Sequence, residues 1–86
     1  MKSLHESKSK AVAGNIRKIR EFRNYTQDYI AAKLAISQNA YSKLELGYCS
    51  ITLGRLMQIA DILEIDMITL INANGQEVVQ IKEVGV

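Results

Sequence analysis

Apolar residues recur every three or four positions through most of this chain, which is the spacing of one face of an α-helix. The pattern predicts five helices: one over about residues 11–23, two short ones between residues 26 and 47, and two more over about 53–63 and 67–71. The side chains predicted to face a common core are Val12, Ile16, Ile19, Phe22, Ile30, Ala31, Leu34, Ala40, Tyr41, Leu44, Leu56, Met57, Ile59, Ala60 and Leu63. The fold class that follows is all-α.

Polar residues with short side chains stand immediately before four of these segments. Thr26, Ser37, Thr52 and Asp66 each carry an oxygen that can accept a hydrogen bond from a free N–H of a first helical turn. The chain contains no proline, so nothing in the sequence interrupts the helices from within. These residues therefore predict where the helices begin.

The C-terminal tail has a different pattern. Asn74-Gly75 is a turn signal, and residues 77–84 are rich in β-branched side chains, which predicts a short β-strand. A lone strand needs a partner, either in its own chain or in a second subunit. We favour the second subunit, because no other strand is predicted. The residues expected to support dimerisation are Met67, Ile68, Ile71, Val79 and Ile81.

The outer face of the second short helix carries Gln38, Asn39, Ser42 and Lys43 and no acidic residue. Side chains of this kind can hydrogen-bond the edges of base pairs, and the DNA major groove admits an α-helix. Gln38 is the best candidate for reading a base, since its amide can bond adenine in two places. Lys43 can reach guanine or a phosphate.

The segment from Thr26 to Gly47 resembles the helix-turn-helix of the phage Cro and CI repressor family. The residues that carry the resemblance are Gln27, Ala31, Tyr41, Leu44, the Glu45-Leu46-Gly47 ending and the upstream Ile19-Arg20 pair. The resemblance extends over roughly residues 12–71. It implies a five-helix, lambda-repressor-like DNA-binding domain that regulates transcription, here followed by the predicted strand.

The resemblance also implies roles for individual residues. Arg20 and Glu45 are expected to form an ion pair that orients the first helix against the third. Contacts with DNA phosphates are expected from Gln27, Tyr48, Ser50 and Arg55. Two positions depart from the family pattern, since Ala35 stands where the turn usually has glycine and Tyr41 where the inner face usually has an aliphatic residue.

Charge divides the chain into unlike halves. Residues 1–48 carry nine Lys and Arg against four Asp and Glu, a net charge of +5, whereas residues 49–86 carry two against five, a net charge of −3. The predicted organisation is a flexible basic arm over residues 1–10, the helix-turn-helix domain over 11–72 and the dimerisation tail over 73–86. The arm is either a frayed terminus or a DNA-backbone contact through Lys8 and Lys10.

A chain of 86 residues has little room for a deep catalytic cleft beside its core. Cys49 is the single cysteine, which excludes an intrachain disulfide and suits a reducing cytoplasm. It is far in sequence from His5, the single histidine, so neither a metal site nor a catalytic pair is expected. We therefore expect a cytoplasmic protein without signal peptide, membrane span, cofactor or enzymatic activity.

The function expected from these features is sequence-specific binding to double-stranded DNA by a homodimeric regulator, a repressor on a palindromic operator. Two alternatives keep the fold: an antitoxin whose acidic C-terminal half holds a toxin, or a restriction–modification controller. A third is a protein-interaction module that has lost DNA binding. The acid-free face of Gln38 and its neighbours favours DNA binding over this last alternative.

Overall fold

The computed structural model of the protein describes residues 4–73. In this part of the chain the helices are α1 (Leu4–Phe22), α2 (Gln27–Leu34), α3 (Gln38–Glu45), α4 (Leu53–Leu63) and α5 (Met67–Asn72). The prediction of a five-helix, all-α domain is therefore confirmed for the described residues. The predicted strand over 77–84, with Val79 and Ile81, lies outside them.

Helix α1 starts earlier than the sequence indicated. It begins at Leu4, so the prediction that this helix starts near residue 11 was wrong, and residues 4–10 of the predicted arm are helical. The segment contains neither glycine nor proline, and it has a surface to lie against. Lys8 and Ser9 line a shallow hollow together with Val12 and Ile51. Contact with the loop before α4 can therefore stabilise turns that an isolated peptide would not hold.

All four predicted N-caps are present. The side chains of Thr26, Ser37, Thr52 and Asp66 accept hydrogen bonds from backbone N–H groups in the first turns of α2, α3, α4 and α5. Each cap residue has an extended backbone, as an N-cap requires. The helix starts are thus fixed by interactions between residues two or three positions apart.

Four helices end in the same way, with a residue of positive φ just after the last turn. These residues are Asn24, Ala35, Gly47 and Glu64. In each case the next residue donates its N–H to the carbonyl five positions earlier, the hydrogen bond of a Schellman motif. The pairs are Tyr25 to Arg20, Ile36 to Ala31, Tyr48 to Lys43 and Ile65 to Ala60. Since only Gly47 avoids the steric cost of this conformation, the other three carry some strain.

One core joins the five helices. Its largest fully buried side chains are Tyr41, Ile16, Ile19, Ile30, Ile59, Leu63 and Leu70. Two predictions of inward-facing residues were wrong, because Ala40 is exposed and Met57 is 52% exposed. Each lies next to the buried arc of its helix but one residue outside it. Leu70 was not predicted, since α5 has too few residues to show a periodic pattern.

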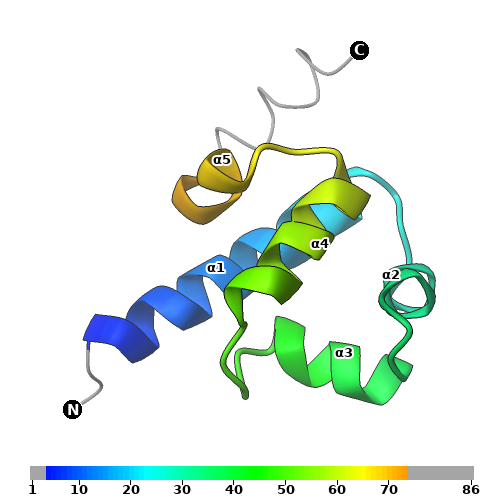
Figure 1. Cartoon of the computed structure of the whole chain (residues 1–86), viewed down its shortest axis with the longest axis horizontal. Helices are drawn as coiled ribbons and strands as arrows, with labels where there is room; N and C mark the ends of the chain where they lie inside the picture. Colours follow the sequence, from blue (N-terminus) through cyan, green and yellow to red (C-terminus); the bar gives the residue numbers. More distant parts are fainter. Residues whose placement is uncertain (1–3, 74–86) are drawn as a thin grey trace.

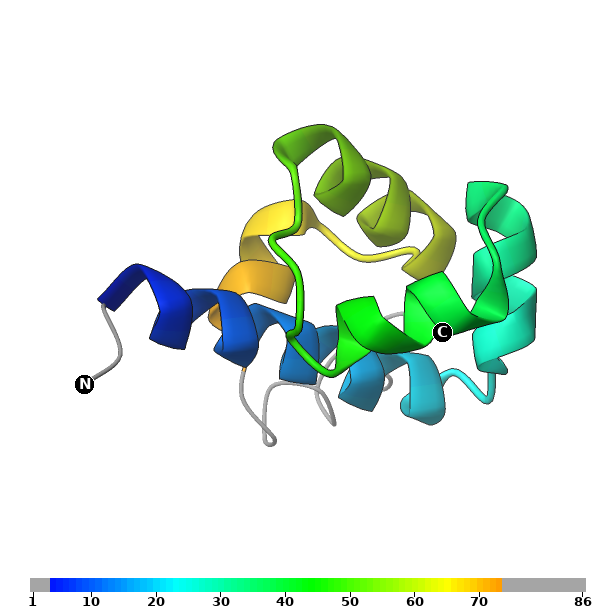
Figure 2. The same cartoon turned by 90° about the horizontal axis from the view of Figure 1, so that it is seen from below.

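The helices form two groups, as Figure 1 shows. Helix α1 packs against α4 and α5, while α2 and α3 form a pair joined to the rest through contacts of α3 with α1 and of α2 with α4. The buried Asn15 side chain donates to the Leu70 carbonyl at 2.9 Å and thereby fastens α5 to α1. Viewed from below, α3 lies in front and beside α1, with no helix covering it on this side (Figure 2). None of the described helices has the length and apolarity needed to cross a membrane.

Candidate nucleic-acid interface

The outer face of α3 presents the polar side chains predicted from the sequence. Gln38, Asn39 and Lys43 are exposed and Ser42 is half-buried. Ser37 caps the helix by accepting from the Ala40 N–H at 3.0 Å. The inner face holds the three buried residues of the helix, Tyr41, Leu44 and Glu45. A short helix is thus fixed on one side and left open on the other.

Helix α2 holds the beginning of α3 through the turn between them. Ala35 has φ 59° and ψ 40°, and its N–H bonds the carbonyls of Ala31 and Ala32. Ile36 follows and packs against the core. The position that carries glycine in the resembling family therefore does need positive φ here, and alanine adopts it at a cost of about 1 kcal/mol.

The buried end of α3 is organised around one carboxylate. Arg20 of α1 donates to both oxygens of Glu45, from Nε to Oε2 at 2.6 Å and from Nη2 to Oε1 at 3.2 Å. It also donates to the Tyr25 carbonyl at 2.8 Å. The side chains of Arg20 and Glu45 are 11% and 2% exposed. The ion pair implied by the resemblance is therefore present, bidentate and almost dry, a geometry in which each charge depends on the other.

Two more side chains bond the same carboxylate. The Tyr41 hydroxyl donates to Glu45 Oε2 at 2.5 Å, and Gln27 Nε2 donates to Glu45 Oε1 at 3.1 Å. The carboxylate thereby joins α1, α2 and α3 at a single point. Among the described residues, no buried side-chain nitrogen or oxygen lacks a hydrogen-bond partner.

These two contacts were not predicted from the sequence. Tyr41 and Glu45 are four residues apart, so their spacing on one helix face was a usable signal. The contact from Gln27 depends on how α2 crosses α3, for which the sequence carries no comparable signal.

Arg20, Gln27, Tyr41 and Glu45 form a polar cluster, and it raises the pKa values of two of its members. Burial raises the pKa of Tyr41 far above its ordinary value of 10.0, and its hydrogen bond to Glu45 raises that pKa further. The hydrogen bond with Glu45 likewise raises the pKa of Arg20 above its ordinary value. The tyrosine hydroxyl is therefore a fixed donor and the guanidinium a fixed cation at neutral pH.

The other predicted phosphate-contact residues lie around α3 in varied environments. Tyr48 is 73% exposed, and Ser50 is exposed in the same loop. Arg55 is half-buried, and its Nη1 lies 3.4 Å from the Leu34 carbonyl at the end of α2. Gln27 is half-buried at the start of α2. Gln27 thus belongs to α2, Arg55 contacts its last residue, and Tyr48 and Ser50 follow α3. Their contact with DNA phosphates stays a prediction.

The described part of the predicted dimerisation surface lies on α5. Ile68 is 65% exposed, whereas Met67 and Ile71 are half-buried and pack against the core.

Cys49 is exposed and free. Within residues 4–73, no group of three or more His, Cys, Asp or Glu side chains is arranged to hold a metal ion.

Comparison with known proteins bears on this arrangement directly. Residues 16–70 match a family model described as "Helix-turn-helix", which extends from the middle of α1 to α5. The same chain gave no match to curated proteins and none to solved structures. The matched region contains the polar cluster around Glu45 and the whole outer face of α3.

Proposed function

The chain belongs to the Cro/CI-like helix-turn-helix family of DNA-binding transcription regulators, and from this membership we propose that it represses transcription as a homodimer bound to a palindromic operator. The observation that supports a sequence-reading role is the outer face of α3. Its side chains are polar, accessible and free of acidic groups, so nothing on this surface repels a phosphate backbone or mismatches a base edge.

Gln38 is the residue proposed to read a base. It lies in the first turn of α3, the end of a recognition helix that enters the major groove. Asn39 and Ser42 extend the same face, and Lys43 supplies a flexible positive charge in the last turn. A lysine on this side of the helix most often meets a phosphate, because it is a point charge on a long stem.

Gln27 is proposed to bind a phosphate while it remains part of the polar cluster. Its amide nitrogen has two N–H groups, and one of them is directed at Glu45. The second can therefore donate to a phosphate at the N-terminus of α2, where the helix dipole favours an anion. In this proposal Tyr48, Ser50 and Arg55 bind the neighbouring phosphates, and Arg55 turns from the Leu34 carbonyl to do so.

A homodimer is proposed because a single recognition helix of eight residues reads few base pairs. Two helices related by a two-fold axis reach successive major grooves about 34 Å apart, which requires a palindromic site. The exposed Ile68 on α5 supports an interface there. Light scattering on the Ile68→Lys variant tests it, and a monomer is expected. Truncation after Ala73 tests the tail in the same way, with a folded monomer that binds its operator far more weakly as the expected result.

The decisive experiment is a gel shift with DNA fragments from the chain's own genomic neighbourhood. We expect one fragment to be retained in the presence of excess random DNA, and footprinting to show a protected palindrome. Retention of no fragment above random DNA would contradict sequence-specific regulation. If a protein co-purified with the chain and competed with the retained fragment, the proposal of an antitoxin would replace that of a simple repressor.

A further inference from the structure

The N-terminal half of α1 lies outside the matched family region. The match begins at residue 16, whereas α1 begins at Leu4. In Figure 1 this part of α1 slopes towards the lower left, and its end reaches the level of α3. Figure 2 shows it extending past the loop that follows α3. The turns of α1 that precede residue 16 therefore lie on the same side of the domain as α3.

Lys10 contacts the residue that ends α3. A Cβ atom at Gly47 would lie 3.0 Å from Lys10 Cγ and 3.5 Å from Lys10 Cα, so the lysine stem rests on the glycine backbone. Gly47 has φ 79° and ends α3. The lysine stem thus lies against the residue from which the loop with Tyr48 and Ser50 continues.

Lys10 carries an exposed positive charge near the end of α3. Its ammonium group forms no ion pair with any residue from 8 to 73. Arg17, two turns further along the exposed side of the same helix, is paired with Glu21 at 3.4 Å. An exposed cation beside the loop that carries two proposed phosphate contacts can reach a neighbouring phosphate.

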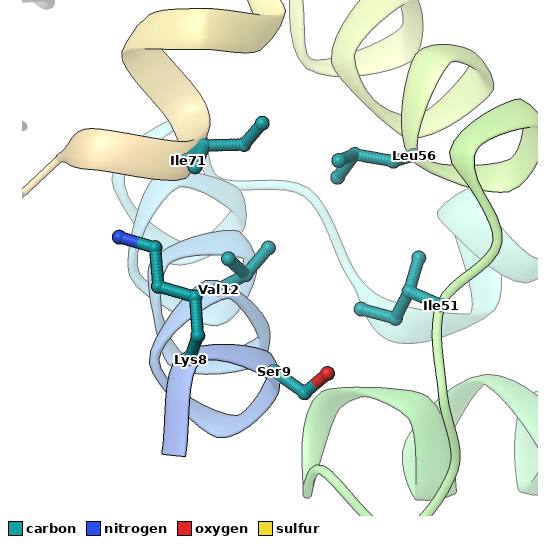
Figure 3. Close-up of a pocket in the computed structure, with 6 residues that line it drawn as sticks. All are labelled: Lys8, Ser9, Val12, Ile51, Leu56 and Ile71. Atoms are coloured by element: carbon teal, nitrogen blue, oxygen red, sulfur yellow. The ribbon is translucent and has the colours of Figure 1, made fainter. Parts of the chain in front are cut away.

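Lys8 provides a natural comparison, because it lies only two residues away on another side of α1. It borders the hollow of about 220 Å³ between α1, the loop before α4, α4 and α5. In Figure 3 its amino group points away from Ile51, towards the side on which Ile71 and α5 lie. The two lysines therefore carry equal charge but lie on different sides of the helix, and only Lys10 is next to Gly47.

We propose that Lys10 binds a DNA phosphate adjacent to those met by the loop after α3, so that the extended α1 adds a backbone contact to the interface. This inference rests on the proposed function, since it concerns the same DNA-bound state. Its physical basis is counterion release: each phosphate neutralised by a lysine adds to the salt dependence of binding, whatever the base sequence.

The test measures the affinity of wild-type protein, Lys10→Ala and Lys8→Ala for a random-sequence DNA duplex by fluorescence anisotropy over a range of salt concentrations. The slope of log K against log salt should be smaller by about 0.9 for Lys10→Ala than for wild type. Raising the salt about fourfold would then weaken the wild type about threefold more than this variant. Lys8→Ala should keep the wild-type slope, and Lys10→Arg should restore it.

The possible results separate the two proposals. Equal slopes for Lys10→Ala and wild type, or equal losses for the two lysine variants, would overturn the role of Lys10 and leave the gel-shift result untouched. A wild-type chain that binds neither random duplex nor genomic fragments would overturn both proposals. Circular dichroism on each variant verifies that the helical fold is retained, as expected for exposed positions.

Discussion

The two faces of α3 differ in burial and in hydrogen bonding, although the helix has only eight residues. The inner face is dry, and its polar groups are bound to one another through the Glu45 carboxylate. The outer face is accessible, and Gln38, Asn39 and Lys43 are exposed on it. The difference implies that substitutions on the inner face should change stability and leave the DNA-binding groups in place. Substitutions on the outer face should change DNA binding and leave stability unchanged.

The largest effect is expected at Glu45 on the inner face. Glu45→Ala removes the partner of Arg20 and the acceptor of Tyr41 and Gln27, so three donors lose their bonds at once. We expect the free energy of unfolding to fall by about 3–5 kcal/mol, because a nearly buried charge is left without its counterion. Urea denaturation measures the change.

Glu64→Ala is the matched control for that experiment. Glu64 is exposed at the end of α4, and both glutamate and alanine pay a similar steric cost at its φ of 58°. Its substitution should change stability by no more than about 0.5 kcal/mol. Comparable losses in the two variants would refute a structural role for the Arg20–Glu45 pair.

The next effect isolates the hydroxyl of Tyr41. Tyr41→Phe keeps the fully buried ring and removes only the hydrogen bond to Glu45. A hydrogen bond to a charged group contributes about 1.5–3 kcal/mol, and a loss of that order is expected in the same denaturation experiment. An unchanged free energy of unfolding would show that the hydrogen bond from Tyr41 to Glu45 adds nothing to stability.

The same hydroxyl predicts a pH dependence at the alkaline end. The pKa of Tyr41 is raised in the folded protein by burial and by Glu45, whereas in the unfolded chain it is about 10. Folding therefore holds a proton that the unfolded chain releases above pH ~10, so this stability is complete below that pH and is lost as the pH rises above it. The slope should be about 1.4 kcal/mol per pH unit. Subtracting the Tyr41→Phe profile from that of the wild type isolates this contribution, and identical alkaline profiles would contradict it.

On the outer face, Gln38→Ala should behave in the opposite way. It should weaken binding to the cognate fragment by about 1–3 kcal/mol and binding to random DNA very little, because it removes base contacts and no phosphate contact. Its melting temperature should equal that of the wild type, since the side chain is exposed. Equal losses on both DNAs would show that Gln38 does not read sequence, and a lowered melting temperature would break the separation between the faces.

The smallest effect concerns Ala35, which belongs to neither face and joins α2 to α3. Ala35→Gly relieves the left-handed conformation at φ 59° but also loosens the unfolded chain, so a net gain of about 0.5–1 kcal/mol is expected. Ala32→Gly, an identical change inside α2, should instead cost about 1 kcal/mol. Thermal melts of both variants decide, and a loss in each would mean that the turn is not strained.

Local rules were enough to determine much of this protein from its sequence. N-caps, helical periodicity and the polar outer face of α3 depend on residues within four positions of one another, so the four caps and the side chains from Gln38 to Lys43 could be read directly. The Arg20–Glu45 pair was foreseen by a different route, from a family resemblance. The local rules failed at the edge of the buried face of a helix, as at Ala40 and Met57. The exposure of such residues depends on how closely neighbouring helices approach.

Only the tertiary structure decided what lies across those helices. It brought Gln27 and Tyr41 to the carboxylate that Arg20 already bound, and it placed the stem of Lys10 on Gly47, 37 residues away in the chain. It also supplied the surface against which residues 4–10 fold as helix instead of remaining an arm. Such contacts join segments that are distant in sequence, so they follow from the crossing of packed helices and not from the pattern along any one of them.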